Sequence, residues 1–83
     1  MTSGKEVVEV FKTNVRNRGT ARQIINCLSS VIEGARVSFD LEDVDRVLRI
    51  AATTEIQASI VVEIVDLFGY EAEVLEDTIL EPR

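Results

Sequence analysis

The first third of the chain carries two kinds of hydrophobic spacing, one after the other. Lys5 to Lys12 has Val and Phe at period-two positions, which predicts a β-strand. Apolar residues then recur at steps of three and four, which predicts an amphipathic helix from about Arg18 to Ile32. Asn17 is the expected N-cap of this helix, and Gly34 is the expected left-handed residue beyond its C-terminal end.

The middle of the chain shows two shorter periodic runs joined by an acidic turn. Arg36 to Glu42 alternates apolar with polar side chains, as does a strand with one solvated face. After the turn Asp43–Asp45, a third strand is expected from Arg46 to Ala52, with Leu48 and Ile50 pointing inward. The two runs together predict an antiparallel hairpin.

A second helical pattern fills most of the remaining sequence. Thr53 or Thr54 is the expected N-cap, and Gly69 is expected to end the helix. A short strand from Glu71 to Leu75 follows. The apolar stripe of the helix is formed by Ile56, Ile60, Val61, Ile64, Val65 and Phe68.

The predicted order is therefore β-α-β-β-α-β. Two right-handed crossovers of this kind give an α+β, ferredoxin-like sandwich, in which two helices cover one face of a four-stranded antiparallel sheet. We expect one domain over residues 1–83, with a core of about 5–76 and a tail at 77–83. Val7, Phe11 and Val47 are expected on the uncovered face of the sheet, as a small apolar patch.

Charge is distributed unevenly, although the net charge is −6. Residues 1–36 hold six Lys and Arg against three Glu, whereas residues 37–83 hold three Arg against twelve Asp and Glu. An acidic chain argues against general nucleic-acid binding, because phosphate contacts need a basic face. The apolar runs are too short to span a bilayer, and no signal pattern is visible at the N-terminus, so we expect a cytoplasmic protein without membrane contact. A single Cys27 fits a reducing compartment.

One family pattern can be followed through the second half of the chain. The run Val37-Ser-Phe-Asp-Leu-Glu-Asp43, then Ile60, Ile64 and Phe68-Gly69-Tyr70-Glu-Ala72, resembles the heavy-metal-associated domains of copper chaperones and metal-transporting ATPases. In that family a strand ends in V-D-L-E, a helix closes in G-Y-x-A, and the first helix follows a Met-x-Cys-x-x-Cys loop. The resemblance covers roughly residues 7–75.

The resemblance also places the metal loop of that family on this chain. We align the first helix with the spacing of apolar residues in that family. The family's buried positions then fall on Ala21, Ile24, Cys27 and Leu28. The two cysteine positions then fall on Asn17 and Thr20, and the buried methionine falls on Val15. Since the chain has no His and one Cys, the resemblance implies a divergent member without the metal site, and we expect no metal and no cofactor.

The segment around the start of the first helix is the candidate binding site. Arginines gather where a helix N-terminus already favours negative charge, so a small anion or an acidic protein patch is the expected partner. Tyr70 can form a second wall near this segment. The alternative is that these are ordinary solvated side chains that balance acidic residues elsewhere. The candidate site residues are Arg16, Asn17, Arg18, Gly19, Thr20, Arg22 and Tyr70.

These observations favour a non-enzymatic binding module, either a monomer or a weak homodimer. A Ser or Cys nucleophile paired with His within one subunit is excluded because the chain has no His. Two other functions stay open at this point. One is copper or zinc binding or trafficking through a non-standard site, in which two chains present either Cys27 or an unusual oxygen site. The other is a small-molecule regulatory domain that acts as a dimer, since this fold hosts unrelated functions.

Overall fold

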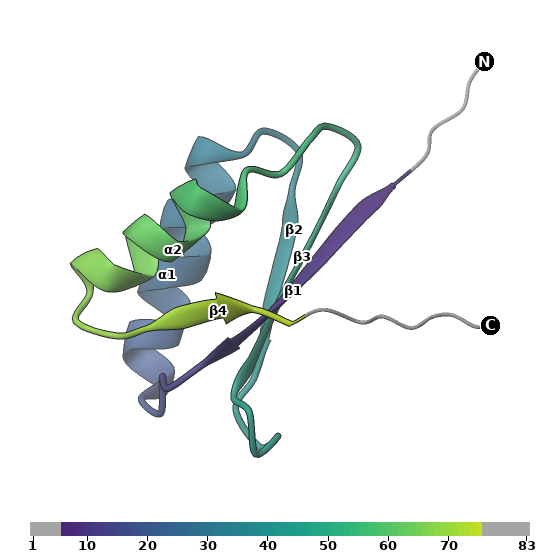
Figure 1. The fold of residues 1–83 in the computed structure, drawn as a ribbon. Coiled ribbons are helices and arrows are strands. Elements are labelled where there is room, and N and C mark those ends of the chain that lie inside the picture. Colours follow the sequence, from purple (N-terminus) through teal and green to yellow (C-terminus); the bar gives the residue numbers. More distant parts are fainter. Residues whose placement is uncertain (1–5, 76–83) are drawn as a thin grey trace, which may run out of the picture.

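The computed structural model describes residues 6–75 and contains six elements of regular structure. All strand pairs are antiparallel, and the sheet order is β2-β3-β1-β4. Figure 1 shows both helices on the same side of this sheet. The predicted α+β fold is confirmed and is consistent with a ferredoxin-like sandwich. The elements are β1 (Val7–Thr13), α1 (Arg18–Val31), β2 (Arg36–Asp40), β3 (Val47–Ala52), α2 (Ala58–Leu67) and β4 (Ala72–Val74).

The hydrophobic core lies between the sheet and the two helices. Phe11 from β1 is fully buried, and in the register it stands opposite Leu48 of β3, which is also fully buried. Fully burying a side chain of this size stabilises the fold by about 1.5–3 kcal/mol, so these paired positions anchor the sheet to the helices. The helices contribute Ala21, Ile24, Leu28, Val61, Ile64 and Val65 to the same cluster.

The predicted orientation of β1 is wrong. Val7 and Phe11 were expected on the uncovered face, but Phe11 faces the helices and Val7, which stands opposite buried Ala52, lies on the same side of the sheet. Val8 and Val10 share the uncovered face instead. Val8 stands opposite Ala51 and is 48% exposed. Valines occur on both faces of β1, so their spacing alone does not define its phase, whereas the pairing of Phe11 with the inward Leu48 does. Val47 does lie on the uncovered face, because it pairs with exposed Asp40.

Local signals predict α1 well. The helix begins at Arg18 after Asn17, whose side-chain oxygen accepts a hydrogen bond from the Thr20 N–H at 3.0 Å. At the other end Gly34 has φ +74°, the left-handed conformation that glycine adopts without steric cost. The helix ends one residue earlier than predicted, and its last residue, Val31, is 51% exposed.

The start of α2 is later than predicted. Thr53 and Thr54 are exposed and precede an irregular segment, and the N-cap is Gln57, which makes no side-chain capping bond. Ile56, expected on the helical stripe, is buried within that irregular segment. Gly69 follows the helix with φ +89°, as the sequence predicts.

The remaining strands are shorter than expected. β2 ends at Asp40, where its side chain accepts a hydrogen bond from the Glu42 N–H and begins a turn. Arg46 has φ +45° and therefore belongs to this turn and not to β3. β4 has three residues, Ala72–Val74, and forms one edge of the sheet.

Candidate functional site

The loop between β1 and α1 presents its arginines to solvent around a well-formed helix start. Arg16 and Arg18 are exposed, whereas Val15 between the strand and these residues is fully buried. The first intrahelical bond is donated by the Ala21 N–H to the Asn17 carbonyl. The first turn of α1 contains no acidic residue. Free backbone N–H groups and two cationic side chains therefore face water at this end of the helix.

Gly19 has a local structural role in this loop. A Cβ atom built at Gly19 would lie 3.1 Å from the Oδ1 of Asn17, which is tighter than an ordinary van der Waals contact. The same oxygen accepts the capping bond from the Thr20 N–H. The absence of a side chain at Gly19 thus leaves room for the Asn17 side chain that caps the helix. This local role explains the glycine without invoking close approach of a ligand.

Arg18 and Arg22 line a groove between α1 and the end of β2. The groove has a volume of about 530 Å³, and on its opposite side lie Asp40 and Glu42. Two cationic and two anionic side chains therefore share this groove, and the arginines face carboxylates of the same chain. The predicted segment is consequently divided: Arg16 faces solvent in the loop, while Arg18 and Arg22 also border an electrically balanced groove.

Two buried or part-buried bonds hold the neighbouring loops in place. Thr13, which is 7% exposed, donates its hydroxyl to the Arg46 carbonyl at 2.7 Å and accepts from the Val15 N–H at 3.2 Å. Asn14 accepts a hydrogen bond from the Glu71 N–H at 2.8 Å. The end of β1 is thereby attached to the β2–β3 turn on one side and to the beginning of β4 on the other.

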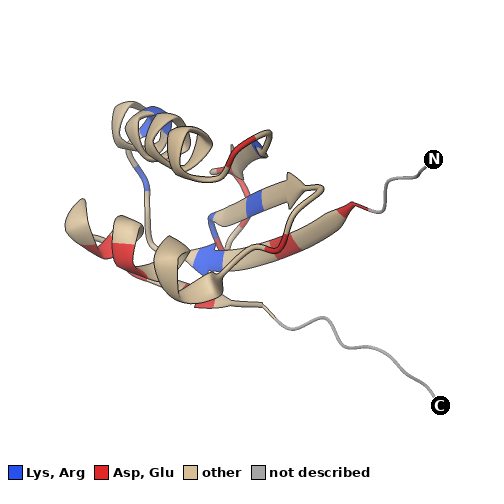
Figure 2. Ribbon diagram, turned by 90° about the horizontal axis from the view of Figure 1, so that it is seen from above, with Lys and Arg blue, Asp and Glu red and all other residues tan. Residues whose placement is uncertain are grey.

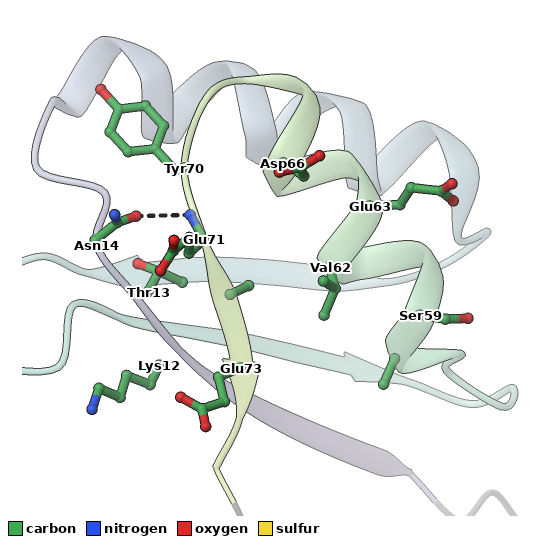
Figure 3. Close-up of a pocket in the computed structure, with 12 residues that line it drawn as sticks. Lys12, Thr13, Asn14, Ser59, Val62, Glu63, Asp66, Tyr70, Glu71 and Glu73 are labelled. Atoms are coloured by element: carbon green, nitrogen blue, oxygen red, sulfur yellow. Dashed lines mark hydrogen bonds between the residues drawn. The ribbon is translucent and has the colours of Figure 1, made fainter.

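A larger groove lies on the other side of the molecule, between α2 and β4, and we call it the α2–β4 groove. Its volume is about 920 Å³. Figure 3 shows Val62, Glu63 and Asp66 rising from α2 on one side, and Glu71 and Glu73 along β4 on the other. The lining residues are Lys12, Thr13, Asn14, Ala58, Ser59, Val62, Glu63, Asp66, Tyr70, Glu71, Ala72 and Glu73.

The α2–β4 groove combines an apolar interior with an acidic rim. Val62, Tyr70 and Ala72 are half-buried and pack against the hydrophobic core. Four exposed carboxylates and one exposed ammonium group, that of Lys12, form the rim. Figure 2 shows the contrast with the other helix, because α2 carries acidic residues, whereas α1 and the loop before it carry basic ones. The groove therefore suits a ligand with apolar and cationic groups.

Tyr70 lies in the α2–β4 groove and not in the groove that contains Arg18 and Arg22. Sequence reasoning did not identify the other residues of its groove. One signal was present in the sequence: Ser59, Glu63 and Asp66 are spaced by four and three residues, which places three polar side chains on one face of a helix whose other residues are mostly apolar.

Cys27 is half-buried on α1 and packs against the hydrophobic core. Its carbonyl oxygen accepts a hydrogen bond from the Ser30 hydroxyl at 2.9 Å. Residues 6–75 contain no group of three or more His, Cys, Asp or Glu side chains placed to hold a metal ion. In the same part of the chain, no helix has the length and apolar character needed to cross a membrane.

Comparison with known proteins assigns no relationship to this chain. No family model, no curated protein and no solved structure matches it.

Proposed function

We propose that this protein is a non-enzymatic module that acts by protein contact, and that the α2–β4 groove is its main contact surface. One observation carries this proposal: half-buried apolar side chains floor a groove of about 920 Å³ whose rim is acidic and exposed. Specific interfaces commonly combine an apolar centre with a charged rim. The acidic rim guides a cationic partner toward the groove, and the apolar floor supplies the area that is removed from water.

The chemistry of the groove supports a binding role over a catalytic one. The chain has no His, and the carboxylates of the groove, such as Glu63 and Asp66, are exposed to water. Carboxylates that serve as acid–base catalysts usually lie in apolar surroundings that exclude water. Exposed carboxylates around an apolar floor are better suited to hold a partner than to transfer a proton.

Site-specific photocrosslinking tests the proposed contact surface. A benzoylphenylalanine at Ser59 lies within the groove, and the same residue at exposed Glu33 lies outside it and serves as the matched control. In cells of the native host, we expect Ser59 to give a discrete adduct whose partner is identified by mass spectrometry. The double substitution Glu63→Lys and Asp66→Lys should abolish this adduct. Equal adducts from both positions, or none from Ser59, contradict the proposal.

We also propose anion recognition at the loop before α1 as a second function, because Arg16 and Arg18 are exposed at a helix start with no acidic residue in its first turn. Inorganic phosphate titrated into the protein should shift the amide NMR signals of Arg18 and Gly19 in a saturable way. The substitutions Arg16→Glu and Arg18→Glu should remove this response and leave the thermal midpoint within a few degrees. Signals that move equally in the variant contradict this second proposal.

A further inference from the structure

The outer edge of β4 is an open strand edge that borders the α2–β4 groove. The sheet order places β4 at one end, with no strand on its outer side among residues 6–75. The Leu75 N–H donates to the Val10 carbonyl at 2.8 Å, and Phe11 stands opposite Val74 in the register. Hydrogen-bonded and non-hydrogen-bonded pairs alternate in an antiparallel ladder.

This alternation determines which backbone groups of β4 are free. Leu75 and Glu73 direct their N–H and C=O groups toward β1, so Ala72 and Val74 direct theirs outward. Thr13 agrees with this assignment, because its N–H bonds to the Asp45 carbonyl on the β3 side and not to Ala72. Two successive outward-facing residues can therefore pair with one added strand along the floor of the groove.

The charges around this edge indicate which strand fits. Glu63 and Asp66 lie above the edge on α2, Glu73 lies on β4, and Glu71 immediately precedes β4. An added strand would thus meet carboxylates on both sides, with Val62 and Ala58 between them. Small apolar side chains of such a strand would face Val62 and Ala58 on the α2 side, and the alternate Lys or Arg side chains would face Glu73 on the other side, since strand side chains point alternately to the two faces. Glu63 and Asp66 at the rim add to the attraction for these cationic side chains.

A second copy of the chain fits the edge poorly. Antiparallel pairing of β4 with the β4 of another copy would bring Glu71 and Glu73 beside the same residues of that copy, and like charges opposite one another destabilise a sheet. Each chain also carries a net charge of −6, which opposes association between copies. Residues 76–83 hold three acidic residues and one Arg, so their charge does not complement the rim either.

From this combination we infer that the α2–β4 groove binds an extended, Lys- or Arg-rich segment of another protein, which adds to the sheet as a strand beside β4. The inference rests on the proposed function and names its mode and partner chemistry. Backbone bonds to Ala72 and Val74 provide the pairing. The carboxylates on α2 and β4 select the charge of the segment.

The test uses the whole chain and a fluorescein-labelled peptide, Lys-Val-Lys-Val-Lys-Val-Lys, with binding followed by fluorescence anisotropy. Val74→Pro removes an outward N–H without removing a bond to β1, and an edge strand tolerates proline in this orientation. We expect the Val74→Pro variant to bind the peptide about tenfold more weakly than the wild-type protein does. The matched Val74→Thr variant should bind the peptide with an affinity within about threefold of the wild-type value. The same peptide methylated on alternate amide nitrogens should bind about tenfold more weakly.

The charge requirement has its own matched pair of variants. Glu63→Lys with Asp66→Lys should lower the affinity about tenfold, whereas Glu33→Lys with Glu55→Lys, which makes the same change in net charge outside the groove, should lower it less than about threefold. The peptide with Glu in place of Lys should not bind. Amide NMR shifts and circular dichroism confirm that each variant is folded.

Several results would overturn the inference. If Val74→Pro and the methylated peptide bind as tightly as their controls, the peptide is held by charge alone and no strand is added. If the protein without peptide sediments as a dimer that Val74→Pro dissolves, the edge is filled by a second copy. A failed peptide experiment combined with a groove-specific crosslink from Ser59 rejects strand addition and leaves the proposed function in place, and failure of both rejects both.

Discussion

Replacing Thr13 with Val should remove a large part of the stability of the fold while keeping the shape of the side chain. The Thr13 hydroxyl makes two bonds, one to the Arg46 carbonyl at 2.7 Å and one from the Val15 N–H at 3.2 Å. A hydrogen bond contributes about 1 kcal/mol net, and a buried group left without a partner costs about 1–3 kcal/mol. Val15 is fully buried, so its N–H would lose its partner away from water. We expect a loss of about 2–3 kcal/mol in the free energy of unfolding.

This loss is large compared with the total stability expected for 83 residues, about 4–12 kcal/mol. Urea denaturation followed by circular dichroism measures it directly. With a slope of about 1 kcal/mol per molar urea, the midpoint should fall by about 2–3 M. The thermal midpoint should fall by about 10–20 °C. Exchange of the Val15 amide hydrogen should also become faster, because opening that end of β1 becomes easier.

Thr13→Ser is the matched control, because it keeps the hydroxyl and removes only a buried methyl group. Its expected cost is about 1 kcal/mol. The order of stability should therefore be wild type, Thr13→Ser, Thr13→Val. The reasoning is refuted if Thr13→Val is as stable as Thr13→Ser or more stable, since the hydroxyl would then contribute nothing to holding the two loops together.

Substitutions at four other positions test separate parts of the same structure by chemical denaturation or hydrogen exchange. Asn17→Ala removes the side-chain cap of α1 and should cost about 1 kcal/mol, while Asn17→Asp should keep most of it; equal losses in both would contradict the capping role. Gly19→Ala alone should leave the free energy of unfolding nearly unchanged. In the Asn17→Ala background it should stabilise the protein by about 0.5 kcal/mol, because the Oδ1 atom that crowds the new Cβ is gone and the higher helix propensity of Ala remains. Equal effects of Gly19→Ala in both backgrounds would contradict this coupling. Gly34→Ala should cost about 1 kcal/mol through its positive φ, with Gly34→Asn costing less, and the reverse order would exclude backbone strain as the cause. Asn14→Ala should speed exchange of the Glu71 amide by about fivefold, and an unchanged rate would mean that this bond does not persist in solution.

Parts of the fold that depend on neighbouring residues in the sequence could be predicted. The Asn17 cap and the left-handed Gly34 and Gly69 are examples, because each follows from one residue type beside one helix end. The phase of β1 could not be predicted in the same way. Its valines make both faces apolar, and the choice is made by the buried pairing of Phe11 with Leu48, which are far apart in the sequence.

The start of α2 shows a second limit. Thr53 and Thr54 are good capping residues in isolation, but the helix begins only at Ala58. Ile56 is buried in the segment between them, so the chain first crosses the end of the core and then turns into the helix. Burial of one large apolar side chain outweighed a capping preference of about 1 kcal/mol.

The candidate site was predictable only where it is local. The arginines around the start of α1 are close together in the sequence, so the order of residues alone predicts that they gather there. The α2–β4 groove brings Lys12 at the end of β1 together with residues of α2 and with Glu73, and only the sheet register does this. Tyr70 was singled out from the sequence, and the structure shows that it lines this groove together with Asn14.

Because of the hydrogen bonds of Thr13, the two ends of the sandwich should differ in how well they tolerate insertions. At one end the Thr13 hydroxyl bonds both to the β1–α1 loop and to the β2–β3 turn. A residue inserted into either of these two connections would therefore disturb the other connection as well. At the opposite end the α1–β2 turn contains exposed Glu33 and Gly34, and no heavy atom lies within 4 Å of a Cβ built at Gly34. That turn is where the chain can be cut and rejoined, extended or fused to another domain with the least disturbance to the sheet.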